Sequence, residues 1–68
     1  MAFMDLKLIM PKLFYVLQEV PKRKDQYHLV ATYSTLKDAN KASGKTNGTV
    51  FLGSHILKNK TKFKIIKP

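Results

Sequence analysis

The feature that most constrains the fold is a pair of strand-like segments separated by a short turn. KLFYVLQEV (12–20) is rich in aromatic and β-branched residues, which are enriched in β-strands. YHLVATYS (27–34) has the period of two that is typical of a strand. Between them lies PKRKDQ (21–26), where Pro21 has the φ that the second position of a turn needs. We therefore expect a β-hairpin.

After the hairpin, the segment STLKDANKAS has the period of an α-helix. Thr35 and Asp38 have the spacing of a capping box, with Asp in place of Glu or Gln, and Ser34 is an alternative N-cap. Gly44 or Gly48 can provide a left-handed C-cap. A narrow apolar stripe is formed by Leu36, Ala39, Ala42 and Ser43. Such a short helix is not stable alone, so we expect it to dock on the sheet.

Two further segments have patterns that favour strands. AFMDLKLIM (2–10) alternates and ends before Pro11, a residue found at strand ends and sheet edges. Thr49 to Leu57 follows the turn signal Asn47-Gly48, and Gly53 within it indicates a bulge or a close approach of backbone. In the first segment, the residues expected to share one face are Ala2, Met4, Leu6, Leu8 and Met10.

The C-terminal segment TKFKIIK (61–67) is expected to be a half-buried strand after a turn at 58–60. Thr61, Phe63 and Ile65 would face inward, and the outward residues would be Lys60, Lys62 and Lys64, about 6.7 Å apart. Together these elements predict a single α+β domain over residues 1–68. It would have a small antiparallel sheet of four to five strands with one short α-helix on one face, in the order β-β-β-α-β-β.

The charge of the chain is strongly basic and uneven. The formal net charge is +9, with 13 Lys and Arg against 4 Asp and Glu. Residues 1–38 carry six basic and four acidic side chains (+2), whereas residues 39–68 carry seven lysines and no acid (+7). Because lysines that neutralise phosphates release counterions, we expect a nucleic-acid interface. Its residues would be Lys58, Lys60, Lys62, Lys64, Lys67, Lys45, Lys22, Arg23 and Lys24, widened by Lys41.

Two other interpretations of the lysines remain open. Lysines along a C-terminal edge strand can prevent aggregation without binding anything. Alternatively, a small basic domain can dock on an acidic protein by charge and by its edge strand, and an edge strand can also form a homodimer. In size and composition the chain resembles bacteriophage accessory proteins that modulate host enzymes. No stretch approaches the roughly 18 apolar residues of a membrane span, so we expect a cytoplasmic protein, in the host cytoplasm if viral, without membrane binding.

Catalytic, metal-binding and cofactor-binding patterns are not evident. There is no cysteine, so disulfide frameworks and Cys-based zinc sites are excluded. His28 and His55 lie on different expected strands, and GSH (53–55) lacks the glycines of a nucleophile elbow. GKTNG (44–48) lacks the first glycine of a phosphate loop and follows a helix instead of preceding one. The four acids, which are scattered, are Asp5, Glu19, Asp25 and Asp38. We therefore expect a binding protein that is not an enzyme and has no cofactor.

One local resemblance covers about half of the chain. The stretch YVLQEV…YHLVATYSTLKDANKASGKTNGTVF (Tyr15 to Phe51) resembles the hybrid-binding domain at the N-terminus of some ribonucleases H. That family has a strand, a turn, a strand ending in Tyr-Ser, a short helix, a glycine-containing turn and a strand, and it binds RNA–DNA hybrids. Leu36 replaces the aromatic residue that follows Tyr-Ser in the family. The resemblance implies a topology, and topology alone does not carry function.

Overall fold

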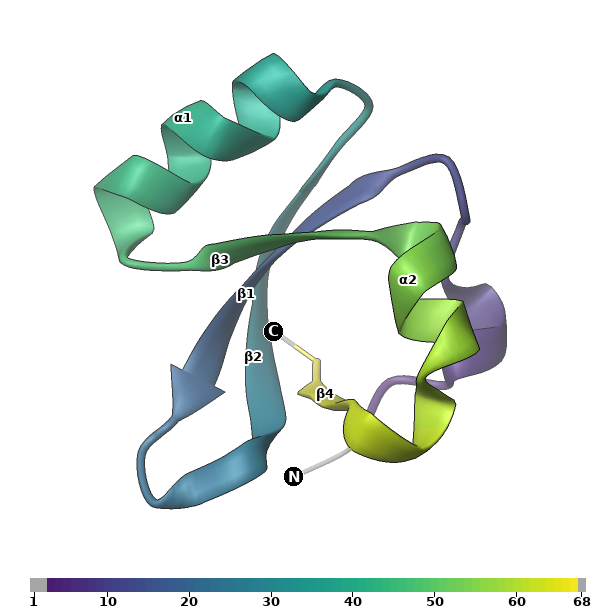
Figure 1. Ribbon diagram of the computed structural model, residues 1–68. Helices are drawn as coiled ribbons and strands as arrows, with labels where there is room; N and C mark the ends of the chain where they lie inside the picture. The colour runs from purple at the N-terminus through teal and green to yellow at the C-terminus, as the bar shows by residue number, and fades with distance from the viewer. Residues whose placement is uncertain (1–2, 68) are drawn as a thin grey trace.

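Four strands form one mixed sheet in the spatial order β3-β1-β2-β4 (Figure 1). The computed structural model describes residues 3–67, so Ala2 of the expected first strand lies outside the described residues. The strands are β1 (Phe14–Val20), β2 (Arg23–Tyr33), β3 (Thr49–Leu52) and β4 (Lys64–Ile66). The helices are α1 (Leu36–Thr46) and α2 (Gly53–Lys58), with two 3₁₀ turns, η1 (Leu6–Leu8) and η2 (Lys60–Lys62). The predicted α+β class is confirmed.

The expected β-hairpin is present. β1 and β2 pair antiparallel from Phe14↔Tyr33 to Val20↔Arg23, with two register irregularities along β1. The turn is shorter than expected, since only Pro21 and Lys22 lie outside the strands, and β2 begins at Arg23. Lys22 has a φ of 66°, in the left-handed region that favours glycine.

The helix α1 begins with the predicted cap. The Thr35 hydroxyl accepts a hydrogen bond from the Asp38 backbone N–H (3.3 Å) and donates one to the Asp38 carboxylate (3.0 Å). The predicted C-cap was wrong, because Asn47 (φ 57°) takes the left-handed position instead of Gly44 or Gly48. Asparagine tolerates this conformation because its short polar side chain can hydrogen-bond locally.

The two faces of the sheet are covered by different elements. On β1, Val16 points to the opposite face from Tyr15 and Leu17, because side chains alternate along a strand. Val16 and Ala39 of α1 are both fully buried, and α1 contacts β1, β2 and β3. On the other face lies the main hydrophobic core, built from Ile9, Tyr15, Leu17, Ile56, Phe63 and Ile65. Figure 1 shows α1 and α2 on separate sides of the strands.

The predicted strand over residues 2–10 was wrong. The Asp5 carboxylate accepts a hydrogen bond from the Lys7 backbone N–H (2.9 Å), and η1 follows directly. Such local side-chain bonds compete with strand ladders. The residues expected to share one face also separate, since Met4 and Leu6 pack against the core whereas Leu8 and Met10 are 61% and 56% exposed. The sheet contact of this segment is an isolated bridge between Phe3 and Ile66.

The predicted strand from Thr49 to Leu57 ends early. β3 stops at Leu52, and α2 begins at Gly53 with Ile56 fully buried. The close approach predicted at Gly53 is confirmed, because a Cβ there would overlap the Met10 carbonyl group. β3 pairs antiparallel with β1.

The C-terminal strand is shorter than predicted, and it pairs parallel with its neighbour instead of antiparallel. β4 contains only Lys64–Ile66 and pairs parallel with β2, so the sheet is not purely antiparallel. Phe63 and Ile65 are buried as expected, but Thr61 lies in η2 and is exposed. β4 is an edge strand, as predicted. No helix among residues 3–67 is long and apolar enough to cross a membrane.

Candidate nucleic-acid interface

The lysines of the C-terminal segment do not form the predicted row. Lys60 and Lys62 lie in η2, where the rise is about 2 Å per residue instead of the 3.3–3.4 Å of a strand. Lys64 lies beyond Phe63 on β4. All three side chains are exposed, as expected, but a change of backbone conformation separates them.

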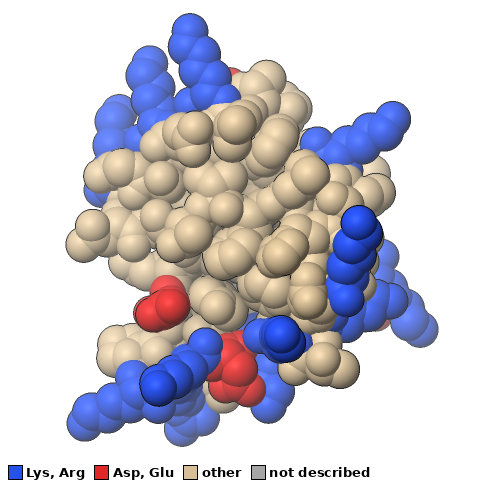
Figure 2. All heavy atoms as spheres, in the orientation of Figure 1, with Lys and Arg blue, Asp and Glu red and all other residues tan. Residues whose placement is uncertain are grey.

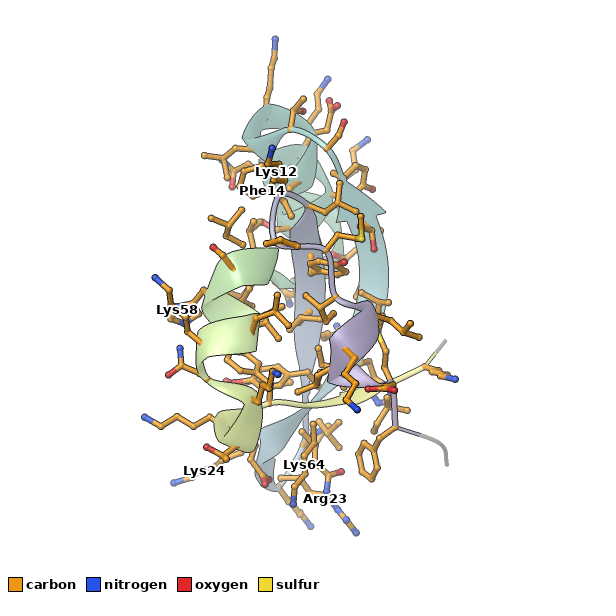
Figure 3. The ribbon with its side chains drawn as sticks, turned by 90° about the vertical axis from the view of Figure 1, so that its right-hand side faces the viewer. Lys12, Phe14, Arg23, Lys24, Lys58 and Lys64 are labelled. Atoms are coloured by element: carbon orange, nitrogen blue, oxygen red, sulfur yellow. The ribbon has the colours of Figure 1, made fainter. Side chains whose placement is uncertain are left out.

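Lys64 is brought to the hairpin by the pairing of β4 with β2. Gln26 lies opposite Lys64 in the sheet, and the Lys64 ammonium lies 3.3 Å from the Asp25 carboxylate. Both side chains are about half exposed, and such surface ion pairs contribute only about 0–1 kcal/mol. Figure 3 shows Arg23, Lys24 and Lys64 at one end of the molecule. We call this surface the hairpin end; its basic residues are Lys22, Arg23, Lys24 and Lys64.

The other predicted contact residues lie elsewhere. Lys58 is in the last turn of α2, and Figure 3 shows it on the side of the molecule, between the hairpin end and Lys12. Lys67 is exposed after β4. Lys45 is in the last turn of α1. The nine residues selected from the sequence therefore do not form one continuous site.

A regular row of lysines is present on α1 instead. Lys37, Lys41 and Lys45 are four residues apart, which places them on one side of the helix at steps of about 6 Å along its axis. We call these three residues the α1 row. Figure 2 shows basic side chains gathered over α1, apart from those at the hairpin end. The sequence interpretation did not select Lys37, although the four-residue spacing within an expected helix would have indicated it.

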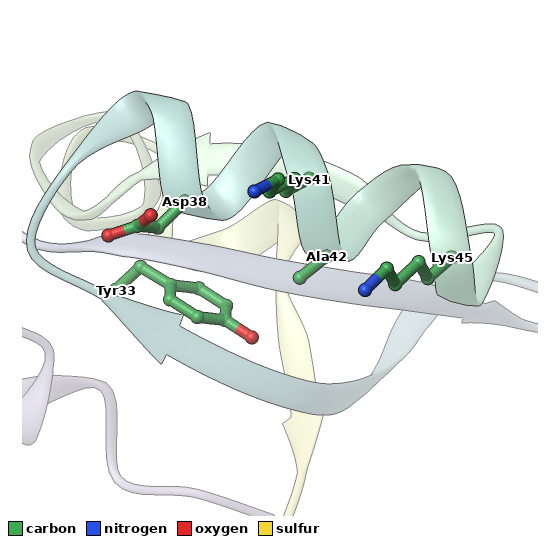
Figure 4. Close-up of a pocket in the computed structure, with 5 residues that line it drawn as sticks. All are labelled: Tyr33, Asp38, Lys41, Ala42 and Lys45. Atoms are coloured by element: carbon green, nitrogen blue, oxygen red, sulfur yellow. The ribbon is translucent and has the colours of Figure 1, made fainter.

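An open hollow lies beside the α1 row, between α1 and β2. Its volume is about 260 Å³, and it is lined by Tyr33, Asp38, Lys41, Ala42 and Lys45. Figure 4 shows Asp38 and Lys45 at opposite ends of the hollow, with the hydroxyl of Tyr33 directed away from Asp38. The side chain of Ala42 is only a methyl group, which leaves the space open. The hollow thus combines two ammonium groups, one carboxylate and one phenol ring.

The three tyrosines have different environments. Tyr15 is 3% exposed, and its hydroxyl accepts a hydrogen bond from the Met10 backbone N–H at 2.9 Å. Tyr27 packs in a cluster of rings, 5.8 Å from Phe51 and 5.4 Å from Phe63. Tyr33 is in none of the ring pairs found among residues 3–67 and borders the hollow. Of the three tyrosines considered from the sequence, Tyr33 is therefore the one that borders the hollow.

Of the groups considered for catalysis, the His55 ring packs among aromatic side chains. The His55 ring stacks on Phe51 with a centroid distance of 6.1 Å. Among the described residues no three His, Asp or Glu side chains gather as a metal site would require.

No protein-family model, curated protein or solved structure matches this chain. The order β1-β2-α1-β3 agrees with the topology that the resemblance to hybrid-binding domains implies. The candidate interface therefore rests on the geometry of the chain itself.

Proposed function

We propose that this protein is a cytoplasmic, non-enzymatic binding module that contacts the backbone of nucleic acid without strong sequence preference. The observation that carries the proposal is the α1 row, in which Lys37, Lys41 and Lys45 repeat every four residues on one helix. Their step of about 6 Å is close to the spacing of successive phosphates along one strand. A helix holds the three ammonium groups in register, which a flexible tail would not do.

The electrostatics of α1 support the same proposal. Like charges four residues apart destabilise an isolated helix by a few tenths of a kcal/mol per pair. Asp38 is the single acidic residue of α1, and its carboxylate is already bonded to the Thr35 hydroxyl. A row of phosphates would remove this repulsion, and each neutralised phosphate would release counterions.

The hairpin end, together with Lys60 and Lys62 of η2, provides a second basic surface. Lys64 is already paired with Asp25. The other cations of this surface are Lys22, Arg23 and Lys24 at the hairpin tip and Lys60 and Lys62 in η2. In the proposal these residues attract the polyanion at a distance and raise the rate of encounter.

The test of this proposal is the salt dependence of binding. A short fluorescent oligothymidylate is expected to bind at low salt, and its affinity to fall at least about tenfold between about 50 and 200 mM salt, since each single-strand phosphate contact adds about 0.7 to the slope. A methylphosphonate oligonucleotide, whose backbone is uncharged, is the control and should not bind. Unchanged anisotropy with excess protein at low salt would refute the proposal.

A second candidate function is supported by the free edge of β3. Thr49–Leu52 is an edge strand without a charged residue or proline, and Leu52 is 39% exposed. Such an edge can extend the sheet of a partner. In this case the chain would be a bacteriophage-type accessory protein that modulates a host protein.

The two functions differ in their dependence on nucleic acid. Host-protein binding predicts a stoichiometric complex that is recovered from cell extract after nuclease treatment. Leu52→Lys is expected to abolish that complex, because a charge on the edge opposes strand addition. A complex that disappears with nuclease would instead indicate capture through nucleic acid.

A further inference from the structure

We propose that the hollow beside the α1 row holds one unstacked nucleotide of a single-stranded nucleic acid. Its phosphate would lie at Lys41 and Lys45, and its base against the ring of Tyr33. This inference rests on the proposed function and adds to it the type of strand and a contact with the base.

The phosphate end of the hollow is defined by three donors. Lys41 and Lys45 are neighbours on one side of α1 and both line the hollow. Figure 4 shows the hydroxyl of Tyr33 pointing away from Asp38, toward the part of the hollow where Lys45 lies. Two ammonium groups and a phenol O–H together suit an anion with several acceptor oxygens.

The base end is defined by the ring of Tyr33. Its hydroxyl and its ring lie at the hollow, whereas Tyr15 and Tyr27 are used in the core. Stacking of a base on an aromatic ring tolerates any sequence, because every base has a π face. The volume of about 260 Å³ lies just below the range of about 300–1,000 Å³ typical of drug-sized ligand pockets. It therefore suits one nucleotide and not a longer segment.

Asp38 orients the nucleotide in the hollow. Its carboxylate lies at the end opposite Lys45, and one of its oxygens is held by the Thr35 hydroxyl at 3.0 Å. A carboxylate repels phosphate and accepts N–H groups, and each nucleobase offers at least one N–H. The phosphate is thus directed to the lysines and the edge of the base to Asp38.

A base in a duplex cannot occupy this position without leaving its stack. Flipping a paired base costs a few kcal/mol, whereas a base in a single strand is already free. The hollow therefore distinguishes single strands from duplexes, although the α1 row by itself would attract both.

The test compares oligothymidylate with an abasic strand of the same length, which has the same phosphates but no bases. Fluorescence anisotropy at one salt concentration is expected to show that the oligothymidylate binds at least about fivefold more tightly, as one stacked base would give. Tyr33→Leu is expected to remove the difference and to leave the salt dependence unchanged. Tyr33→Phe, which keeps the ring, is the matched control and should retain it.

Each outcome supports or overturns the inference. Equal affinities of the unmodified protein for the two strands would overturn it, even if salt-dependent binding still supported the proposed function. A duplex of equal length that competes as well as the single strand would also overturn it. Adenosine monophosphate, added at the concentration of the oligonucleotide, should not displace it; displacement would show a mononucleotide site instead.

Discussion

Replacing Gly53 by alanine is expected to lower the free energy of unfolding by about 3 kcal/mol, at the upper end of the usual range for overpacking. Gly53 is buried at the start of α2, and a Cβ there would overlap the carbonyl group of Met10 and lie 3.2 Å from Cα of Pro11. These atoms belong to the backbone, so rotation of a side chain cannot relieve the overlap.

The turn before β1 is also fixed in place by hydrogen bonds. The Gly53 backbone N–H donates to the Leu13 carbonyl (2.8 Å), and the Ser54 N–H donates to the Pro11 carbonyl (3.1 Å). Moving the turn to make room for a methyl group would break these bonds and disturb Ile9 in the core. A domain of this size rarely has more than about 3–5 kcal/mol of stability from its core, so the variant should be close to unfolded at room temperature.

Gly44→Ala is the matched control for this prediction. Gly44 lies within α1, a Cβ there would meet nothing within 4 Å, and its φ is not positive. Alanine is favoured over glycine inside a helix, so this variant should be about 0.5–1 kcal/mol more stable. Urea denaturation followed by circular dichroism measures both changes. Equal stability of Gly53→Ala and the unmodified protein would contradict the packing of the turn against α2.

The parts of the fold that follow from local chemistry could be predicted from the sequence. Pro21 marks the hairpin turn, the residues of 12–20 favour a strand, and Thr35 with Asp38 marks the start of the helix. In each case the signal and the structure depend on residues that are close in the chain.

The segments whose structure was predicted wrongly are those whose conformation depends on contacts with residues distant in the chain. Residues 53–57 were predicted to continue the strand that begins at Thr49, but the buried Gly53 and Ile56 place them against the turn before β1 and the core. In the C-terminal segment, Phe63 and Ile65 are buried as predicted, but three residues suffice to pair with β2 and the preceding lysines form a 3₁₀ turn. Of the three residues expected to face inward here, Phe63 and Ile65 are buried, whereas Thr61 lies in the 3₁₀ turn and is exposed.

The proposal of a polyanion as ligand comes from the sequence, whereas the α1 row comes from the structure. The excess of lysine in residues 39–68 indicated a polyanion as ligand, and the expected row was assigned to the segment with the clearest alternation. The row on α1 depends on a helical period that Lys37, Lys41 and Lys45 follow equally clearly. Tyr33 could not be separated from Tyr15 and Tyr27 before the packing was known, because all three lie in hairpin strands.

Neutralising the α1 row is expected to weaken binding of single-stranded DNA about a hundredfold at 0.1 M salt. The variant is Lys37→Gln, Lys41→Gln and Lys45→Gln together. If each lysine neutralises one phosphate, the loss of three contacts lowers the slope of log affinity against log salt by about 2, and at 0.1 M this corresponds to two orders of magnitude. Glutamine has a helix propensity similar to that of lysine, so α1 should persist.

The matched control removes the same charge from another place. Lys58→Gln, Lys60→Gln and Lys62→Gln together also lower the net charge by three, but they lie in α2 and η2. If the α1 row is the contact surface, this control should lose only a few-fold in affinity and keep its salt slope, because distant charges act mainly on the rate of encounter. Equal losses in the two variants would show that binding depends on net charge alone. A larger loss in the control would show that the contact surface lies at Lys58, Lys60 and Lys62 instead. Because the two variants have the same net charge, any difference between them must come from the position of the lysines.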